Sequence, residues 1–212
     1  AQGRGNPLEL RMRLVMLSRS TSFSGGSVRR VCVFESHLDS QAKTFSLPLD
    51  NLYRFANQLA LQGSFSPHES SKQRAHPWAQ APSGFIELLS RSRHDTLRFA
   101  EALSLQNTRS GLAFSHESYR DYFLARMIFN ELLQSPSSFT DSLINKISLY
   151  NKQDILNLIA DMYHLYAFQT MEWQVILHRC VASAKDNPQN KVAAANAMSI
   201  IAACPDVSLQ FP

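Results

Sequence analysis

Several signatures of chemistry are missing from this 212-residue chain. Its seven glycines form no Gly-x-x-x-x-Gly-Lys-Ser/Thr phosphate loop, so we do not expect the chain to hydrolyse nucleotide on its own. It also lacks a Gly-x-Ser-x-Gly nucleophile elbow and a His-Glu-x-x-His zinc helix. We therefore predict that the isolated chain has no catalytic residue, no metal site and no cofactor of its own.

Cysteine is scarce, and long apolar runs are absent. The three cysteines, Cys32, Cys180 and Cys204, are widely spaced, which favours reduced thiols packed in a core over metal ligands. No apolar run approaches the roughly 20 residues of a membrane-spanning helix, so we expect no membrane partner and a cytoplasmic location. The N-terminus has neither Met nor an apolar leader, which favours a fragment of a longer polypeptide.

Charge is distributed unevenly along the chain. Residues 1–126 hold 16 of the 21 Lys and Arg but only 10 of the 17 Asp and Glu. A basic N-terminal part suits a phosphate-bearing or acidic partner. A solvated, arginine-rich surface is the simpler explanation for any single arginine in it.

The most informative stretch covers residues 105–133. Two short apolar runs, 102–106 and 112–114, flank Asn107-Thr-Arg-Ser-Gly111, which suits a tight reversal and predicts a β-hairpin. A helix follows, with Ser115 as its predicted N-cap. This helix is apolar on nearly all sides and therefore has to be buried. Its large apolar residues are Tyr119, Tyr122, Phe123, Leu124, Met127, Ile128, Phe129, Leu132 and Leu133.

Before this stretch, apolar residues at helical spacing alternate with polar segments. Asn6-Pro7-Leu8 starts the first helix, because Asn6 can cap it and Pro7 fits the first helical position. Residues 27–34 fit either a strand or the beginning of a helix, and 64–83 fit a long surface loop. Helices are predicted at 8–18, 49–62, 84–90 and 95–102.

After Pro136 the pattern becomes entirely helical. Short polar links separate the helices, so we expect antiparallel packing that resembles a helical superhelix without a true internal repeat. These helices are predicted at 138–150, 152–168, 171–185 and 191–204. The predicted fold is mainly α: a partial small helical domain at 1–48, a winged helix with a short β-hairpin wing at 49–134, and a helical domain at 135–212.

Two segments resemble a known family. Phe114-Ser-His116-Glu-Ser-Tyr-Arg-Asp-Tyr-Phe-Leu-Ala125 resembles the motif Phe-x-His-x-Ser/Thr-Phe-x-Glu-Tyr/Phe-hydrophobic-Ala-Ala. That motif ends the winged-helix domain of NACHT-type (STAND) signalling nucleotide hydrolases, which include the animal Nod-like receptors of innate immunity. Tyr119, Asp121 and Arg126 depart from the usual Phe, Glu and Ala. Asn6-Pro7-Leu8 is similar to the start of the family's small helical domain, 109 residues before His116.

The resemblance implies a regulatory, nucleotide-sensing module. His116 would contact the phosphates of ADP, Pro7 would pack on the adenine, and an upstream domain of the same polypeptide would bind the ADP or ATP. Exchange of ADP for ATP would release the module and permit self-oligomerisation. For His116, the position at a strand-to-helix joint fits donation to a phosphate, and a histidine bonded within the wing is the structural alternative.

Two other functions stay open. A winged-helix nucleic-acid-binding protein would use the basic N-terminal part and an exposed basic helix before the wing. Arg91, Arg93 and Arg98 cluster in this region, whereas Leu97, Phe99, Leu103 and the apolar helix after the wing are suited to packing. A helical protein-interaction scaffold is the third hypothesis, and it would make the His116 motif accidental.

Overall fold

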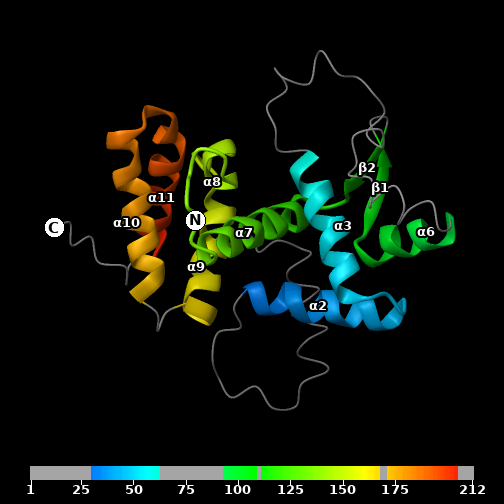
Figure 1. Cartoon of the computed structure of the whole chain (residues 1–212). Helices are drawn as coiled ribbons and strands as arrows, with labels where there is room; N and C mark the ends of the chain where they lie inside the picture. Colours follow the sequence, from blue (N-terminus) through cyan, green and yellow to red (C-terminus); the bar gives the residue numbers. More distant parts are fainter. Residues whose placement is uncertain (1–29, 63–92, 109–110, 168–170, 205–212) are drawn as a thin grey trace, which may run out of the picture. The chain divides into compact units, whose positions relative to one another are not determined.

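A computed structural model of the chain describes residues 30–62, 93–108, 111–167 and 171–204 (Figure 1). The described part is mainly helical with one two-stranded antiparallel sheet, which confirms the mainly α fold class with a short hairpin. The predicted helices at 8–18 and 84–90, the loop at 64–83 and Pro7 lie outside the described residues. The chain divides into two units, Ala1–Arg120 and Asp121–Pro212. The division into three domains stays a prediction.

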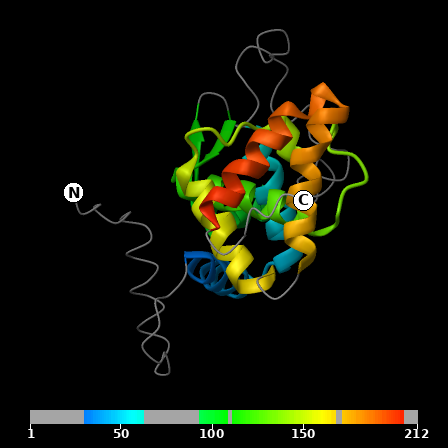
Figure 2. The same ribbon diagram turned by 90° about the vertical axis from the view of Figure 1, so that its left-hand side faces the viewer.

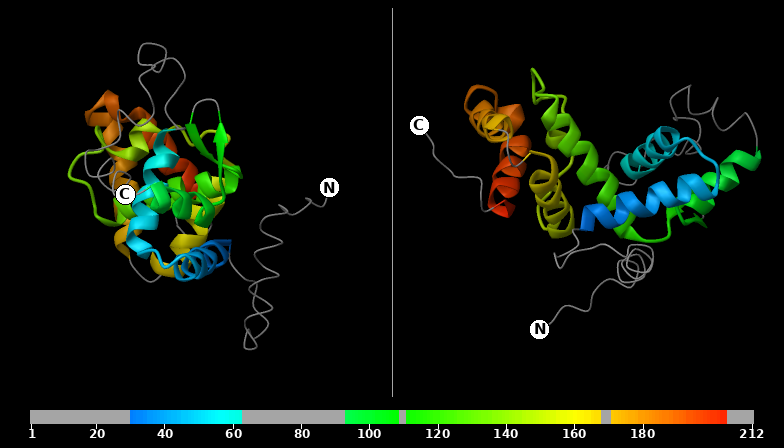
Figure 3. Two further views of the ribbon diagram at one scale, coloured as in Figure 1. Left: turned by 90° about the vertical axis from the view of Figure 1, so that its right-hand side faces the viewer. Right: turned by 90° about the horizontal axis from the view of Figure 1, so that it is seen from below.

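The first unit contains the helices α2 (Arg30–Thr44), α3 (Leu49–Gln62) and α6 (Arg93–Ala102). For residues 30–34, the helix α2 decides the open question in favour of a helix, whose apolar residues at helical spacing are buried. The helix α3 has the predicted bounds, and α6 begins two residues earlier than predicted. The view from below shows α2 and α3 side by side (Figure 3).

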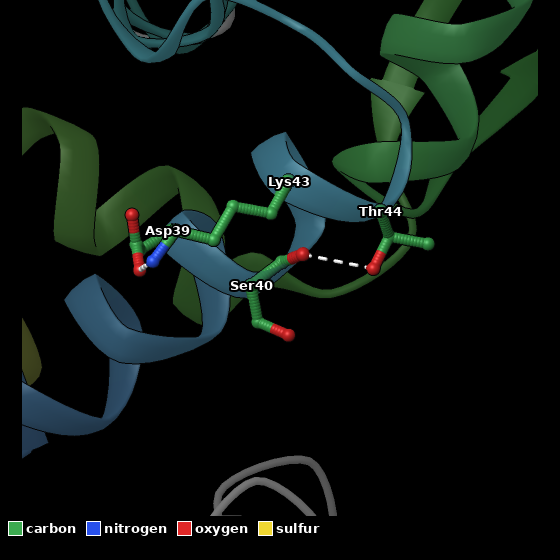
Figure 4. Close-up of polar contacts among 4 residues, drawn as sticks. All are labelled: Asp39, Ser40, Lys43 and Thr44. Atoms are coloured by element: carbon green, nitrogen blue, oxygen red, sulfur yellow. Dashed lines mark hydrogen bonds and ion pairs between the residues drawn. The ribbon is translucent and has the colours of Figure 1, made fainter.

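The helix α2 ends in an exposed polar turn. Lys43 Nζ lies 2.6 Å from Asp39 Oδ2, and the Thr44 hydroxyl donates to the Ser40 carbonyl at 2.9 Å (Figure 4). Ser46 follows with a positive φ of 53°, and Pro48 prevents the helix from continuing. Both side chains of the ion pair are largely exposed, so the pair adds little to stability.

The hairpin consists of β1 (Leu105–Thr108) and β2 (Gly111–Phe114). Leu105 pairs with Phe114 and Asn107 pairs with Leu112, so Asn107 belongs to a strand and not to the turn in which we predicted it. Ser104 connects α6 to β1 with a positive φ of 51°, and its carbonyl accepts a hydrogen bond from Ser115 N at 3.1 Å. This bond closes the open end of the hairpin.

The helix α7 (Glu117–Leu133) follows the hairpin, and the boundary between the two units falls within it. Most of its large apolar residues are buried, as predicted, although Met127 is only half-buried and Leu133 is 42% exposed. The predicted N-cap is displaced by one residue. Ser115 stays bonded to the hairpin through Ser104, so the helix begins at Glu117 and His116 directly precedes it.

The second unit continues with further helical elements. They are α8 (Leu143–Lys146), α9 (Gln153–Met162), the π-helix η1 (Tyr163–Ala167), α10 (Met171–Asp186), the 3-10 helix η2 (Pro188–Asn190) and α11 (Lys191–Ala203). The predictions at 152–168, 171–185 and 191–204 agree with these bounds. Phe129 and Tyr163 pack on the fully buried Trp173, with ring centroids 4.8 and 6.1 Å from its ring. Figure 2 shows α10 and α11 side by side.

The helix predicted at 138–150 is wrong, because only Leu143–Lys146 is α-helical in this segment. The buried side chain of Asn196, on α11, explains the difference. Its Nδ2 donates to the carbonyls of Ile144 and Ile147 at 2.7 and 2.6 Å, and its Oδ1 accepts from Leu149 N at 2.9 Å. The Asn196 side chain thus provides the irregular backbone of this segment with hydrogen bonds that a helix would otherwise make internally.

Candidate functional site

The candidate site is the joint between β2 and α7, where sequence analysis placed His116. The hairpin register and the bond from Ser115 N to Ser104 O fix the chain up to this residue. Tyr119 N then donates to the His116 carbonyl at 3.2 Å, which closes the first turn of α7. His116 therefore lies at the positive end of the dipole of a 17-residue helix.

The side chain of His116 is half-buried, and its Nδ1 is inaccessible to solvent. Within the described part of the chain, Nδ1 makes no hydrogen bond. Leaving a buried polar atom of this kind unpaired costs about 1–3 kcal/mol. The structural alternative, a histidine bonded within the wing, is thus not realised at this nitrogen.

Tyr119 anchors the first turn of α7 within the first unit. Its ring is fully buried, at 5.7 Å from Phe34 in α2 and 6.2 Å from Phe114 in β2. Burial raises the pKa of the Tyr119 hydroxyl, and the nearby Ser104 side chain opposes part of that shift. The contact between the Tyr119 hydroxyl and Ser104 does not meet the geometry of a hydrogen bond. The Tyr119 hydroxyl is therefore buried and neutral, and it makes no hydrogen bond among the described residues. Tyr119 therefore serves to hold His116 in position.

Arg120 is a residue that sequence analysis missed. It lies four positions after His116, so the two residues share one side of the helix. Its Nε is buried and has no hydrogen-bond partner among the described residues. The sequence could have indicated Arg120, because it places two basic side chains four residues apart at the N-terminus of a predicted helix. Such a pair, together with first-turn N–H groups, suits an anion such as a phosphate.

The other predicted binding residue, Pro7, lies outside the described residues, so the structure does not test whether it joins His116. In α6, the ring of Phe99 is buried and stacks on Phe55 with centroids 5.3 Å apart, and Leu103 is also buried. These two residues pack as expected. The side chain of Arg93 is outside the described set.

The described residues outside this joint include two buried thiols. Cys180 and Cys204 are both fully buried, and burial raises the pKa of Cys180 to about 12 although the charge of Arg179 opposes the shift. Within the described ranges, no group of three or more His, Cys, Asp and Glu side chains is arranged to hold a metal ion. No helix in those ranges has both the length and the apolar character needed to cross a membrane.

Comparison with protein-family models, with curated proteins and with solved structures finds no match for this chain. Its function therefore has to be inferred from its own residues.

Proposed function

We propose that this chain is the regulatory, nucleotide-sensing module of a NACHT-type signalling NTPase. The module closes over ADP that is bound to an upstream domain of the same polypeptide, and it thereby controls self-oligomerisation. The observation that supports this proposal best is the buried, unpaired Nδ1 of His116 at the N-terminus of α7. The resemblance of the motif around His116 is the reason for proposing this family. The unpaired Nδ1 is the reason for proposing that His116 receives a ligand.

The mechanism is a shift between two populations. A phosphate of ADP at the joint accepts a hydrogen bond from the His116 ring, and the helix dipole and Arg120 favour its negative charge. Pro7 packs on the adenine, as the resemblance implies. These contacts exist only in the closed state, so ADP stabilises that state, and replacement by ATP frees the module to rotate and oligomerise.

Burial in α6 weighs against the alternative of nucleic-acid binding. That function needs an exposed basic recognition helix, whereas Phe99 of α6 is buried against Phe55 of α3 and Leu103, just after α6, is also buried. The helical scaffold hypothesis gives no role to an unpaired imidazole nitrogen. Both hypotheses predict that nucleotide has no effect on the parent protein.

His116→Ala in the full-length parent protein tests the proposal. Loss of one charge-assisted hydrogen bond costs about 1.5–3 kcal/mol, which loosens the closed state by about ten- to a hundredfold. The variant should release a fluorescent ADP analogue faster by that factor, as measured by displacement in stopped-flow. It should also oligomerise without its trigger in sedimentation.

His94→Ala is the control, since it also removes one imidazole and lies in α6, away from the motif. It should release ADP like the wild-type protein. Unchanged ADP release in His116→Ala would reduce His116 to a structural residue of the wing. A parent polypeptide without a phosphate loop before Ala1 would refute the whole proposal.

A further inference from the structure

The helix α11 is apolar on both its inner and its outer side. Its inner side packs in the second unit through Ala193, Ala197 and Ile200, all fully buried. On its outer side, Met198 is 54% exposed and Val192 is 42% exposed. Figure 2 shows α11 beside α10 on the side of this unit that faces the viewer. A helix with two apolar sides is typical of one that is buried on both.

Four of the five exposed residues of α11 form one straight stripe along the helix, and Val192 lies outside this stripe. The residues of this stripe are all exposed and are spaced by four, three and four positions: Lys191, Ala195, Met198 and Ala202. This is the spacing of a coiled-coil seam. The neighbouring Ser199 donates its hydroxyl to the Ala195 carbonyl at 3.0 Å, so its own helix already satisfies this donor. The stripe is therefore suited to close, dry packing against another helix.

The spacing of four, three and four residues is the same from either end of the helix. The stripe can therefore pack against a second copy of itself that runs in the opposite direction. In an antiparallel pair about a two-fold axis, Lys191 of one copy faces Ala202 of the other, and Met198 faces Ala195. Each large side chain then meets a small one, which is the combination that fills a helix interface without voids.

Charge also selects the antiparallel arrangement. Lys191 lies at the N-terminus of α11, where a cation opposes the positive end of the helix dipole. The first turn has no acidic residue, and the last turn has no basic residue. An antiparallel partner places each Lys191 beside the negative end of the other helix, whereas a parallel partner places Lys191 against Lys191.

We propose that the stripe of Lys191, Ala195, Met198 and Ala202 is a self-association surface, through which two copies of this chain pair by antiparallel packing of α11. A single helix pair is smaller than the interfaces of obligate dimers, so the dimer is a weak, reversible one. This pairing involves no nucleotide and is independent of the proposed role of His116.

Sedimentation of the complete 212-residue chain over a wide range of concentrations tests the pairing. A monomer–dimer equilibrium is expected, and Met198→Glu should weaken association at least about tenfold because it brings a charge into the seam. Tyr150→Glu is the matched control, since it introduces the same charge at a side chain that is 79% exposed and lies outside α11. It should leave association unchanged. A chain that stays monomeric, or a dimer that Met198→Glu does not weaken, overturns the proposal.

Lys191→Glu separates association from folding. An acidic residue at this position favours the dipole of its own helix, so thermal unfolding followed by circular dichroism should show a monomer at least as stable as the wild type. The same carboxylate faces the negative end of the partner helix, so association should weaken by several-fold. Equal or stronger association would contradict the antiparallel arrangement.

Disulfide cross-linking determines the direction of the pair. An equimolar mixture of Lys191→Cys and Ala202→Cys should form a linked dimer on mild oxidation. Lys191→Cys alone should not, because two copies of this position lie about 16 Å apart along an antiparallel pair, too far for a disulfide. The unmodified chain controls for its native cysteines. Linkage of Lys191→Cys to itself would show parallel helices and overturn the proposal.

Discussion

At the link between α7 and α9, the buried amide of Asn196 makes three hydrogen bonds to backbone atoms, whereas at the start of α7 the buried Nδ1 of His116 makes none within the described residues. Both groups are polar and both are removed from water. The Asn196 amide satisfies backbone hydrogen-bonding groups around Ile147 that would otherwise need water as a partner. His116 Nδ1 has no such partner among the described residues, so this nitrogen does not stabilise the fold through a hydrogen bond there.

The surroundings of the two groups differ in the same way. Around Asn196, other amides complete the network: Asn145 Nδ2 donates to the carbonyls of Thr140 and Gln189, and its Oδ1 accepts from Ala193 N at 2.9 Å. Around His116, the Tyr119 hydroxyl and Arg120 Nε also lack a full hydrogen-bond partner in the described part of the chain. Three of the buried side-chain atoms without a hydrogen-bond partner in the described ranges thus belong to residues 116–120, where the phosphate is proposed to bind, whereas others, such as Trp173 Nε1, lie elsewhere.

The largest expected effect comes from α7, the helix that carries His116 at its start. Phe123 is fully buried in this helix, and Phe123→Ala should lower the free energy of unfolding by about 3–5 kcal/mol because truncation leaves a cavity. Urea denaturation measures the loss. Leu133→Ala, at a side chain that is 42% exposed, is the control and should cost less than about 1 kcal/mol. A loss below that value for Phe123→Ala would show that α7 is not a central helix.

Asn196→Ala removes the side chain that makes all three of these hydrogen bonds to the irregular segment. The carbonyls of Ile144 and Ile147 and the amide of Leu149 would lose their partner, so we expect a loss of about 2–4 kcal/mol in denaturant unfolding. Hydrogen exchange at the Leu149 amide should accelerate, since this amide donates to Asn196 Oδ1.

The control for this variant is Asn157→Ala. Asn157 is an exposed asparagine of α9 whose Oδ1 accepts a hydrogen bond from Gln153 Nε2 at 2.9 Å, so its removal should change stability by less than about 0.5 kcal/mol. If Asn196→Ala unfolds like this control, with unchanged exchange at Leu149, the amide does not hold the irregular segment.

The contrast also explains which parts of the fold were predictable from sequence. The bounds of α3, and the presence of a hairpin followed by the buried helix α7, follow from apolar spacing and from turn residues, which are local signals. The segment at 138–150 has the same apolar spacing, yet its backbone is set by Asn196, about 50 positions later in the chain. No local pattern reports such a bond, so a helix was predicted where only Leu143–Lys146 is helical.

For the candidate site, the sequence supplied His116 through its motif and correctly placed it between hairpin and helix. It did not indicate that Nδ1 is unpaired, because that depends on how the hairpin, α2 and α7 pack around Tyr119. The displaced N-cap has a similar cause. Ser115 is a good capping residue by type, but its backbone is committed to the bond with Ser104.

The smallest expected effect tests the unpaired side of the comparison. Tyr119→Phe keeps the ring that packs on Phe34 and Phe114 and removes only the hydroxyl. Because this hydroxyl is buried without a full hydrogen bond, the free energy of unfolding at neutral pH should stay unchanged or rise by up to about 1 kcal/mol. Urea denaturation at pH 7 measures the change.

The pH dependence of the same variant provides a second measurement. Burial raises the pKa of Tyr119 above its ordinary value of 10.0, so above about pH 10 the unfolded chain releases this proton while the folded chain retains it. Deprotonation therefore favours unfolding, and the wild type should lose stability as the pH rises past 10, whereas Tyr119→Phe should lose less. A loss of more than about 1.5 kcal/mol in the variant at neutral pH would mean that the hydroxyl is hydrogen-bonded. The start of α7 would then resemble the Asn196 network, which would weaken the proposal that the His116 ring receives a ligand.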